Sequence, residues 1–280
     1  MTNPPAILVA GLDHPEGVCQ APDGHVYATG ERGQVYRVDM AEGCFAEVGT
    51  TGGFGLGIAA DADSNLYVCD MGAKAVMRVR QDGSASVYAR GAPDEPFTVP
   101  NFPVFDAGGT LYVSNSGGWA TADGTIQRIA PDGSAAVWSR AACGFTNGMA
   151  LSPDGRFLYV VESNPPLVSR ITLRTDGTAG AYEVVAPLPG TVPDGIAFDA
   201  DGRLYVACYA PDRIYRIAPG GAPEILYDDW TRMLLNAPTN LAFAGPNLDR
   251  LVIASLGGTA LTVAEPGARG ARLPAPRLAG

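Results

Sequence analysis

An all-β fold, a six-bladed β-propeller with four-stranded blades, is predicted by three features of the 280-residue sequence. Glycine (36 residues) and proline (23 residues) are abundant and dispersed, which is typical of many turns between short strands. One phrase recurs along the chain: an apolar start, an Asp-Gly-like turn and a strand centred on tyrosine. Its copies are spaced 40 to 47 residues apart, which is the period of a four-stranded propeller blade.

The repeat has six copies, and each copy is predicted to begin with the inner strand of a blade. The copies are 17–29, 57–69, 102–114, 148–161, 195–207 and 241–254. The second strands are centred on Tyr27, Tyr67, Tyr112, Tyr159, Tyr205 and Val252. Third strands are predicted at 35–38, 76–79, 126–129, 168–171, 214–217 and 260–263. Most copies end in a fourth short apolar stretch, and closing such units into a ring removes their exposed edges.

Both ends of the chain and two insertions depart from the repeat. We expect residues 7–10 to supply the outer strand of the sixth blade and so to close the ring. A proline-rich insertion at 91–100 and a loop or short helix at 228–238 are predicted on the face where the inner strands begin. The whole chain, 1–280, is expected to be one domain, with an irregular tail from about residue 266.

Composition excludes several classes of partner. The net charge is −10 and no basic run exists, which argues against nucleic acid or an anionic membrane as a partner. The first residues lack the basic and apolar regions of a signal peptide, and no apolar run is long enough to span a membrane. Five widely spaced cysteines indicate reduced thiols. A cytoplasmic protein that acts on a small molecule is therefore predicted, with no indication of its oligomeric state.

The residues just before the inner strands are predicted to meet at one mouth of the central channel. These six residues are Glu16, Leu56, Asn101, Asn147, Asp194 and Asn240. Five of them carry side-chain oxygens, and the two carboxylates would repel each other unless a cation or a proton joined them. Oxygen ligands without His or Cys favour a hard cation such as Ca²⁺, Mg²⁺ or Mn²⁺. The alternative is turn chemistry, because Asn-Gly at 147–148 and Asp-Gly at 194–195 are common turn formers.

The repeat also carries three tripeptides in a characteristic order: Pro-Glu-Gly at 15–17, Thr-Asn-Gly at 146–148 and Pro-Asp-Gly at 193–195. With them, essentially the whole chain resembles the SMP-30/gluconolactonase/luciferin-regenerating-enzyme family. The resemblance implies one divalent metal ion bound by Glu16, Asn147 and Asp194. Ca²⁺ is the expected ion, with Mn²⁺, Mg²⁺ or Zn²⁺ as alternatives. Asn101 is expected to contact the substrate or a metal-bound water.

The activity that this resemblance implies is a metal-dependent lactonase, a carboxylic ester hydrolase. The metal would polarise the ring carbonyl and water would attack it, with Asp194 as the expected general base and Asn101 as an orienting catalytic residue. The alternative is a non-hydrolytic member that binds a small ligand or catalyses another reaction at the same metal site.

One departure from the sugar-lactone pattern bears on the substrate. Sugar-lactone members of the family carry an arginine two residues before the asparagine of the third blade, where this chain has Val99. A more apolar pocket is therefore predicted, with Phe102, Asn115 and Trp119 beside Asn101 as substrate contacts. His14 and Asp70 are further candidates for the rim, with a surface role and channel-facing polar filler as their respective alternatives.

Overall fold

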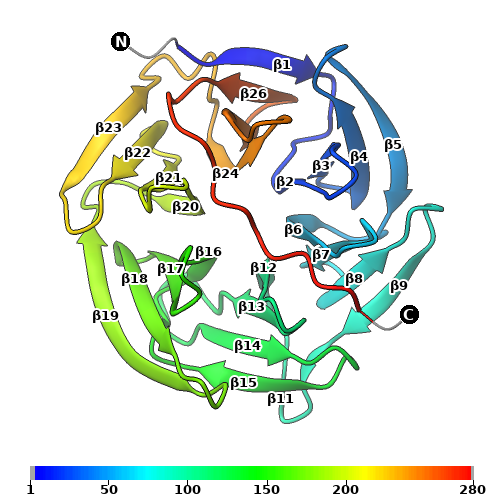
Figure 1. Cartoon of the computed structure of the whole chain (residues 1–280), viewed down its shortest axis with the longest axis vertical. Coiled ribbons are helices and arrows are strands. Elements are labelled where there is room, and N and C mark those ends of the chain that lie inside the picture. The colour runs from blue at the N-terminus through cyan, green and yellow to red at the C-terminus, as the bar shows by residue number, and fades with distance from the viewer. Residues whose placement is uncertain (1–3, 279–280) are drawn as a thin grey trace.

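The computed structural model describes residues 4–278, in which six four-stranded antiparallel sheets are arranged radially around a central axis (Figure 1). This arrangement confirms the predicted six-bladed β-propeller. In each of the first five blades the strands follow one another in sequence order from the channel outward. Within residues 4–278 no helix has the length and apolar character needed to cross a membrane.

The strands coincide with the predicted repeat units. Blade 1 contains β2 (Val18–Gln20), β3 (Val26–Thr29), β4 (Gln34–Asp39) and β5 (Cys44–Thr50), and blade 2 contains β6 (Gly55–Ala60), β7 (Leu66–Asp70), β8 (Ala75–Val79) and β9 (Ala85–Ala89). Blade 3 contains β12 (Pro100–Phe105), β13 (Leu111–Asn115), β14 (Thr125–Ile129) and β15 (Ala135–Ser139). Blade 4 contains β16 (Thr146–Leu151), β17 (Phe157–Ser163), β18 (Pro166–Leu173) and β19 (Ala179–Pro187). Blade 5 contains β20 (Pro193–Phe198), β21 (Leu204–Cys208), β22 (Arg213–Ile217) and β23 (Pro223–Asp228).

The sixth blade is assembled from both ends of the chain, as predicted. It contains β24 (Pro238–Ala244), β25 (Arg250–Ser255) and β26 (Ala260–Ala264), and β1 (Ala6–Ala10) pairs antiparallel with β26 as the outer strand. Val9 and Leu12 continue this closure into the core, where they pack with apolar residues of blades 1 and 6. The ring is therefore closed by hydrogen bonds and by apolar burial.

The tyrosines of the repeat hold neighbouring blades together. Tyr67 of blade 2 packs edge-to-face on Phe105 of blade 3, with ring centroids 4.9 Å apart. Tyr205 of blade 5 contacts Phe243 of blade 6 in the same way at 5.1 Å. The hydroxyl of Tyr205 donates to Asp199 in the turn of its own copy. The recurring phrase of an Asp turn and a tyrosine strand therefore encodes both the hairpin and the contact with the next blade.

The two insertions lie between blades, and within the described residues neither contains a helix. Residues 91–100 include a two-stranded ribbon, β10 (Gly91–Ala92) paired with β11 (Glu95–Pro96). Residues 229–237, between β23 and β24, form turns and bends. Asp229 organises these turns, because its carboxylate accepts hydrogen bonds from the backbone N–H groups of Leu234 and Leu235.

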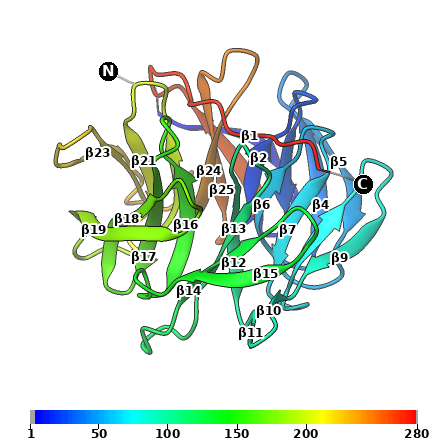
Figure 2. The same cartoon turned by 60° about the horizontal axis from the view of Figure 1, so that its bottom comes forward.

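The carboxyl-terminal tail crosses the face of the ring opposite the starts of the inner strands (Figure 1). Its path is irregular, as predicted, but it is tied to several blades by backbone hydrogen bonds. Ala271 donates to Phe198 at the end of β20, Gly270 donates to Leu248, and Ala62 donates to Pro276. Figure 2 shows the tail along one face of the molecule and the β10–β11 ribbon on the other. The tail thus links blades 2, 5 and 6 on the face away from the predicted site.

Candidate metal centre

The predicted ring of polar residues coincides with an irregularity that recurs at the start of the inner strands. In β6, β12, β16, β20 and β24 the pairing register shifts within the first few residues. The five predicted ring residues of blades 2 to 6 lie within these shifts. A β-bulge of this kind re-aims a side chain, and bulges are common beside functional sites. Glu16 lies just before β2, where its N–H donates to the carbonyl of Thr29.

The glycines that follow the ring residues allow the blades to approach closely at this point. A Cβ atom on Gly148 would lie 2.5 Å from the carbonyl oxygen of Asp194, and one on Gly195 would lie 2.5 Å from that of Thr239. Neither glycine has a positive φ, and the Asn147-Gly148 and Asp194-Gly195 pairs lie inside β16 and β20. The alternative that these pairs form turns is therefore wrong, because the glycines serve packing between blades.

The three predicted ligands lie together at this mouth of the channel. Glu16, Asn147 and Asp194 are all buried. The Asp194 carboxylate lies close enough to Glu16 to affect its ionisation, and the Asn147 amide lies close enough to Asp194 to lower the pKa of that carboxyl group. Asn240 of blade 6 donates from Nδ2 to Glu16 Oε2 at 2.9 Å.

The oxygen atoms of the site fit a hard divalent cation. Asn101 Oδ1, Asn147 Oδ1, Asp194 Oδ1 and Asn240 Oδ1 are buried and have no hydrogen-bond partner within residues 4–278. Buried polar atoms in folded proteins are normally paired with protein or with ordered water, so four such oxygens from one structural ring are suited to a bound cation and its waters. Carboxylate and amide oxygens are the ligands that Ca²⁺, Mg²⁺ and Mn²⁺ prefer.

The electrostatics of the two carboxyl groups support the same conclusion. Burial raises the pKa of Asp194 to about 7, an effect that its hydrogen bond with Asn147 partly opposes. Burial also raises the pKa of Glu16 well above its usual range; the Asp194 carboxylate raises it further, and the Asn240 hydrogen bond lowers it. The two groups resist carrying negative charge together, and a divalent cation between them would relieve that cost.

The predicted substrate contacts occupy different surroundings. Asn115 is buried, and its Oδ1 accepts a hydrogen bond from the N–H of Val99 at 2.9 Å, so it holds the segment leading to Asn101. Phe102 is buried in the core shared by blades 3 and 4. Trp119 is 46% exposed, and its ring lies edge-on to Phe145 with centroids 5.0 Å apart. Of these three predicted contacts, Trp119 has the most exposed side chain, and its partner Phe145 leads directly into β16.

Two residues near the site were missed by the sequence analysis. Ser163, at the end of β17, donates to the carbonyl of Pro193 and accepts a hydrogen bond from Asn147 Nδ2 at 3.2 Å. Tyr209, just after β21, is half-buried, and its pKa is raised by burial and by the charges of Asp194 and Glu16. The signal available in the sequence was position: Ser163 ends a second strand and Tyr209 directly follows one, next to the place that Asp70 occupies in blade 2.

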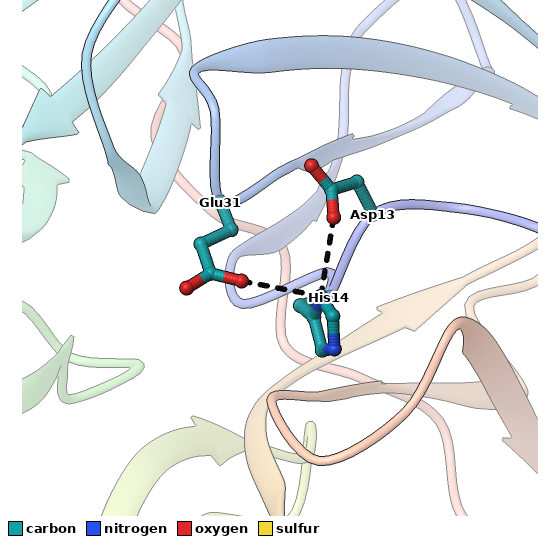
Figure 3. A group of neighbouring side chains, drawn as sticks. All are labelled: Asp13, His14 and Glu31. Carbon is teal, nitrogen blue, oxygen red and sulfur yellow. Dashed lines mark hydrogen bonds and ion pairs between the residues drawn. The ribbon is translucent and has the colours of Figure 1, made fainter.

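The other two rim candidates differ in their surroundings, and Asp70 Oδ2 is a further buried oxygen without a hydrogen-bond partner within residues 4–278. Asp70 is buried, and its Oδ1 accepts hydrogen bonds from the N–H groups of Phe54 and Ala73. Figure 3 shows His14 with Asp13 and Glu31, whose nearest carboxylate oxygens both lie 3.1 Å from His14 Nδ1. These three side chains offer ligand atoms within 4.8 Å of one another, but an ion pair between the imidazole and the two acids accounts for their arrangement equally well.

A radial ring of six blades with buried carboxylate and amide oxygens at one mouth defines a class of propeller with a candidate cation site. Residues 14–257 match the model of the SMP-30/Gluconolactonase/LRE-like region, and the chain belongs to this family.

Among curated proteins, the chain is 27% identical over 207 residues to the Lactonase drp35 of Staphylococcus saprophyticus; the match covers 68% of this chain and 62% of that protein. It is 32% identical over 113 residues to the 6-deoxy-6-sulfogluconolactonase of Pseudomonas putida, covering 39% of this chain and 38% of that protein. The chain thus spans less than two thirds of the length of these relatives.

Solved structures share the fold over nearly the whole chain. A gluconolactonase from Xanthomonas campestris superposes with a TM-score of 0.80 at 20% identity, covering 94% of this chain and 95% of that one. The calcium-binding protein regucalcin from Agrobacterium tumefaciens gives a TM-score of 0.78 at 19% identity, covering 99% and 98%. At this level of identity the likeness establishes the fold.

Proposed function

We propose that this protein is a divalent-metal-dependent hydrolase that opens a lactone. The observation that carries the proposal is the convergence of Glu16, Asn147 and Asp194 at one mouth of the channel, with partnerless buried oxygens on Asn147, Asp194 and their neighbours. Relatives named as lactonases support the reaction class. The name of the calcium-binding structural neighbour supports Ca²⁺ as the ion.

In the proposed reaction, each residue of the site has a distinct task. Glu16, Asn147 and Asp194 would hold the cation, which when bound supplies Lewis acidity toward the ring carbonyl. Asp194, a buried carboxylate with Oδ1 unpaired within residues 4–278, would accept a proton from the attacking water. Asn101, whose Oδ1 is buried and unpaired within residues 4–278, would orient that water. Ser163 holds Asn147 in place by its hydrogen bond.

The proposed substrate is less polar than a sugar lactone. Val99 supplies no hydrogen-bond donor from its side chain where sugar-lactone members carry arginine, and its N–H is already bonded to Asn115. Trp119 and Phe145 present an aromatic pair next to the start of β16, and Tyr209 adds a half-buried ring near Asp194. An apolar substituent on the lactone would be accommodated by these rings.

A cytoplasmic location remains a prediction.

The test is lactone hydrolysis followed with a pH indicator over a panel of sugar and alkyl-substituted lactones. Excess chelator should abolish the activity, and added Ca²⁺ or Mn²⁺ should restore it. Asp194→Asn should remove turnover while leaving a folded ring, whereas Glu224→Gln, on an outer strand, should leave turnover unchanged. Full activity in excess chelator, with metal analysis confirming removal, would contradict the proposal. Tight metal binding without turnover of any lactone would favour a non-hydrolytic reaction.

A further inference from the structure

Asn240 makes two hydrogen bonds to the same residue of another blade. It lies in β24, is fully buried, and its Nδ2 donates to Glu16 Oε2 at 2.9 Å and to the Glu16 carbonyl oxygen at 3.0 Å. One amide group therefore fixes both the side chain and the backbone of Glu16. Thr239 adds a third bond across this junction, from its hydroxyl to the Glu16 carbonyl at 2.9 Å.

The orientation of the Asn240 amide is determined by its partner. A carboxylate and a backbone carbonyl only accept hydrogen bonds, so the atom that faces Glu16 must be the amide nitrogen. The amide oxygen is then directed elsewhere. A Cβ atom built on Gly195 would lie 2.7 Å from Asn240 Oδ1, which places this oxygen beside the residue that follows Asp194. Asn240 thus lies between the strand that carries Asp194 and the Glu16 carboxylate.

The contact with Asn240 stabilises a carboxylate whose surroundings otherwise disfavour its charge and leave its orientation free. Burial and then the nearby Asp194 carboxylate disfavour the charged form of Glu16. Its long side chain also loses rotamer freedom when it is held in one orientation. A fixed donor at 2.9 Å holds the carboxylate in one orientation and leaves its other oxygen available. The Asn240 Oδ1, buried and without a partner within residues 4–278, adds an acceptor on the same side of the ring.

We propose that Asn240 is a positioning residue for the metal centre, which holds the Glu16 carboxylate in the orientation that meets the cation. The inference rests on the proposed function in one respect, namely that Glu16 and Asp194 bind a divalent cation. It extends that proposal to blade 6, which supplies none of the three ligands. The cation would then be held by residues of blades 1, 4 and 5, and blade 6 would orient the Glu16 carboxylate.

The experiment measures metal binding directly. Mn²⁺ affinity is determined by calorimetry, and Tb³⁺ luminescence lifetimes count the water molecules on the bound ion. Asn240→Leu removes the donor at similar volume, and Asn240→Ala removes it with less risk to folding. Each should weaken Mn²⁺ binding by about tenfold or more, as expected for a lost hydrogen bond to a charged group, and should add water to bound Tb³⁺. Thr262→Val, a buried change in the same blade, is the matched control and should alter neither value.

The possible outcomes separate this inference from the proposed function. If the unmodified protein binds Mn²⁺ and a folded Asn240 variant binds it with the same affinity and the same number of waters, the positioning role is overturned. If the unmodified protein binds no divalent cation, both proposals fail. Weaker binding in the Asn240 variants with Thr262→Val unchanged supports the inference, and activity should then return at Mn²⁺ concentrations above the raised Kd.

Discussion

Asp194 combines burial, a raised pKa and a position at the start of β20. Its carboxyl group titrates at about 7 in the folded protein, against a usual value of 3.8. Between these values the folded metal-free protein retains a proton that the unfolded chain has released. The stabilising contribution of this group is therefore complete below about pH 4 and is lost progressively as the pH rises toward 7.

In excess chelator, the free energy of unfolding of the unmodified protein should fall as the pH rises from 5 to 7.5. The fall should be smaller in Asp194→Asn, whose amide does not ionise. Urea unfolding followed by tyrosine and tryptophan fluorescence at several pH values measures the difference. Two curves that run parallel across this range would show that Asp194 titrates at its usual value.

Single residues also show which spatial relationships could be predicted from the sequence. Glu16, Asn147 and Asp194 were predicted because each occupies the same place in a periodic repeat, and periodicity converts sequence position into spatial convergence. Tyr209 and Ser163 lie at the ends of second strands, where side-chain types differ from blade to blade. Without a recurring residue type, only the contacts themselves could reveal that Ser163 holds Asn147.

At the scale of the elements, packing between inner strands determines which residues can follow the ring positions. Gly148→Ala would place a methyl group 2.5 Å from the Asp194 carbonyl oxygen, which belongs to the backbone of the next inner strand. Because the contacted atom belongs to the backbone, no side-chain rotation can relieve the clash. The packing of β20 against β24 also limits how far β20 can shift. We expect a loss of about 1–3 kcal/mol in stability and, since Asp194 must move, weaker metal binding.

Thermal unfolding and Mn²⁺ titration of Gly148→Ala measure these two effects. Gly108→Ala is the matched control, because its nearest neighbour is the Asp106 Oδ1 atom at 3.3 Å, a side-chain end that can shift. A Gly148→Ala protein as stable as the control and with unchanged metal affinity would show that β16 and β20 separate more easily than the structure indicates.

The strands themselves were predictable because hydrophobic alternation recurs along the repeat and Asp-Gly turns recur in the first five blades. The β10–β11 ribbon was not predicted, since two-residue strands are too short to show alternation. Neither were the register shifts in β16 and β20, because a bulge changes hydrogen-bond pairing without changing the order of residue types.

At the scale of the whole molecule, the tail from residue 266 connects distant parts of the ring. It bonds to the end of β20, to the turn before β25 and to the turn after β6, all on the face opposite Glu16 and Asp194. Deletion of residues 266–280 should therefore lower the melting temperature by several degrees, while metal affinity at a temperature where the ring is folded should persist. Calorimetric unfolding and Mn²⁺ titration of the truncated protein test this separation. Loss of metal binding by a folded truncated protein would show that the two faces are coupled.

The closure of the ring has a consequence for the time at which the site forms during synthesis. The Glu16 carbonyl is bound by Thr239 and Asn240, which follow it by 223 and 224 residues in the chain, and β1 must wait for β26 before it can pair. A nascent chain that ends before residue 239 contains every proposed ligand but lacks the blade that orients the first of them. A folding intermediate in which blade 6 has not yet docked should therefore retain a cation less tightly than the closed ring does.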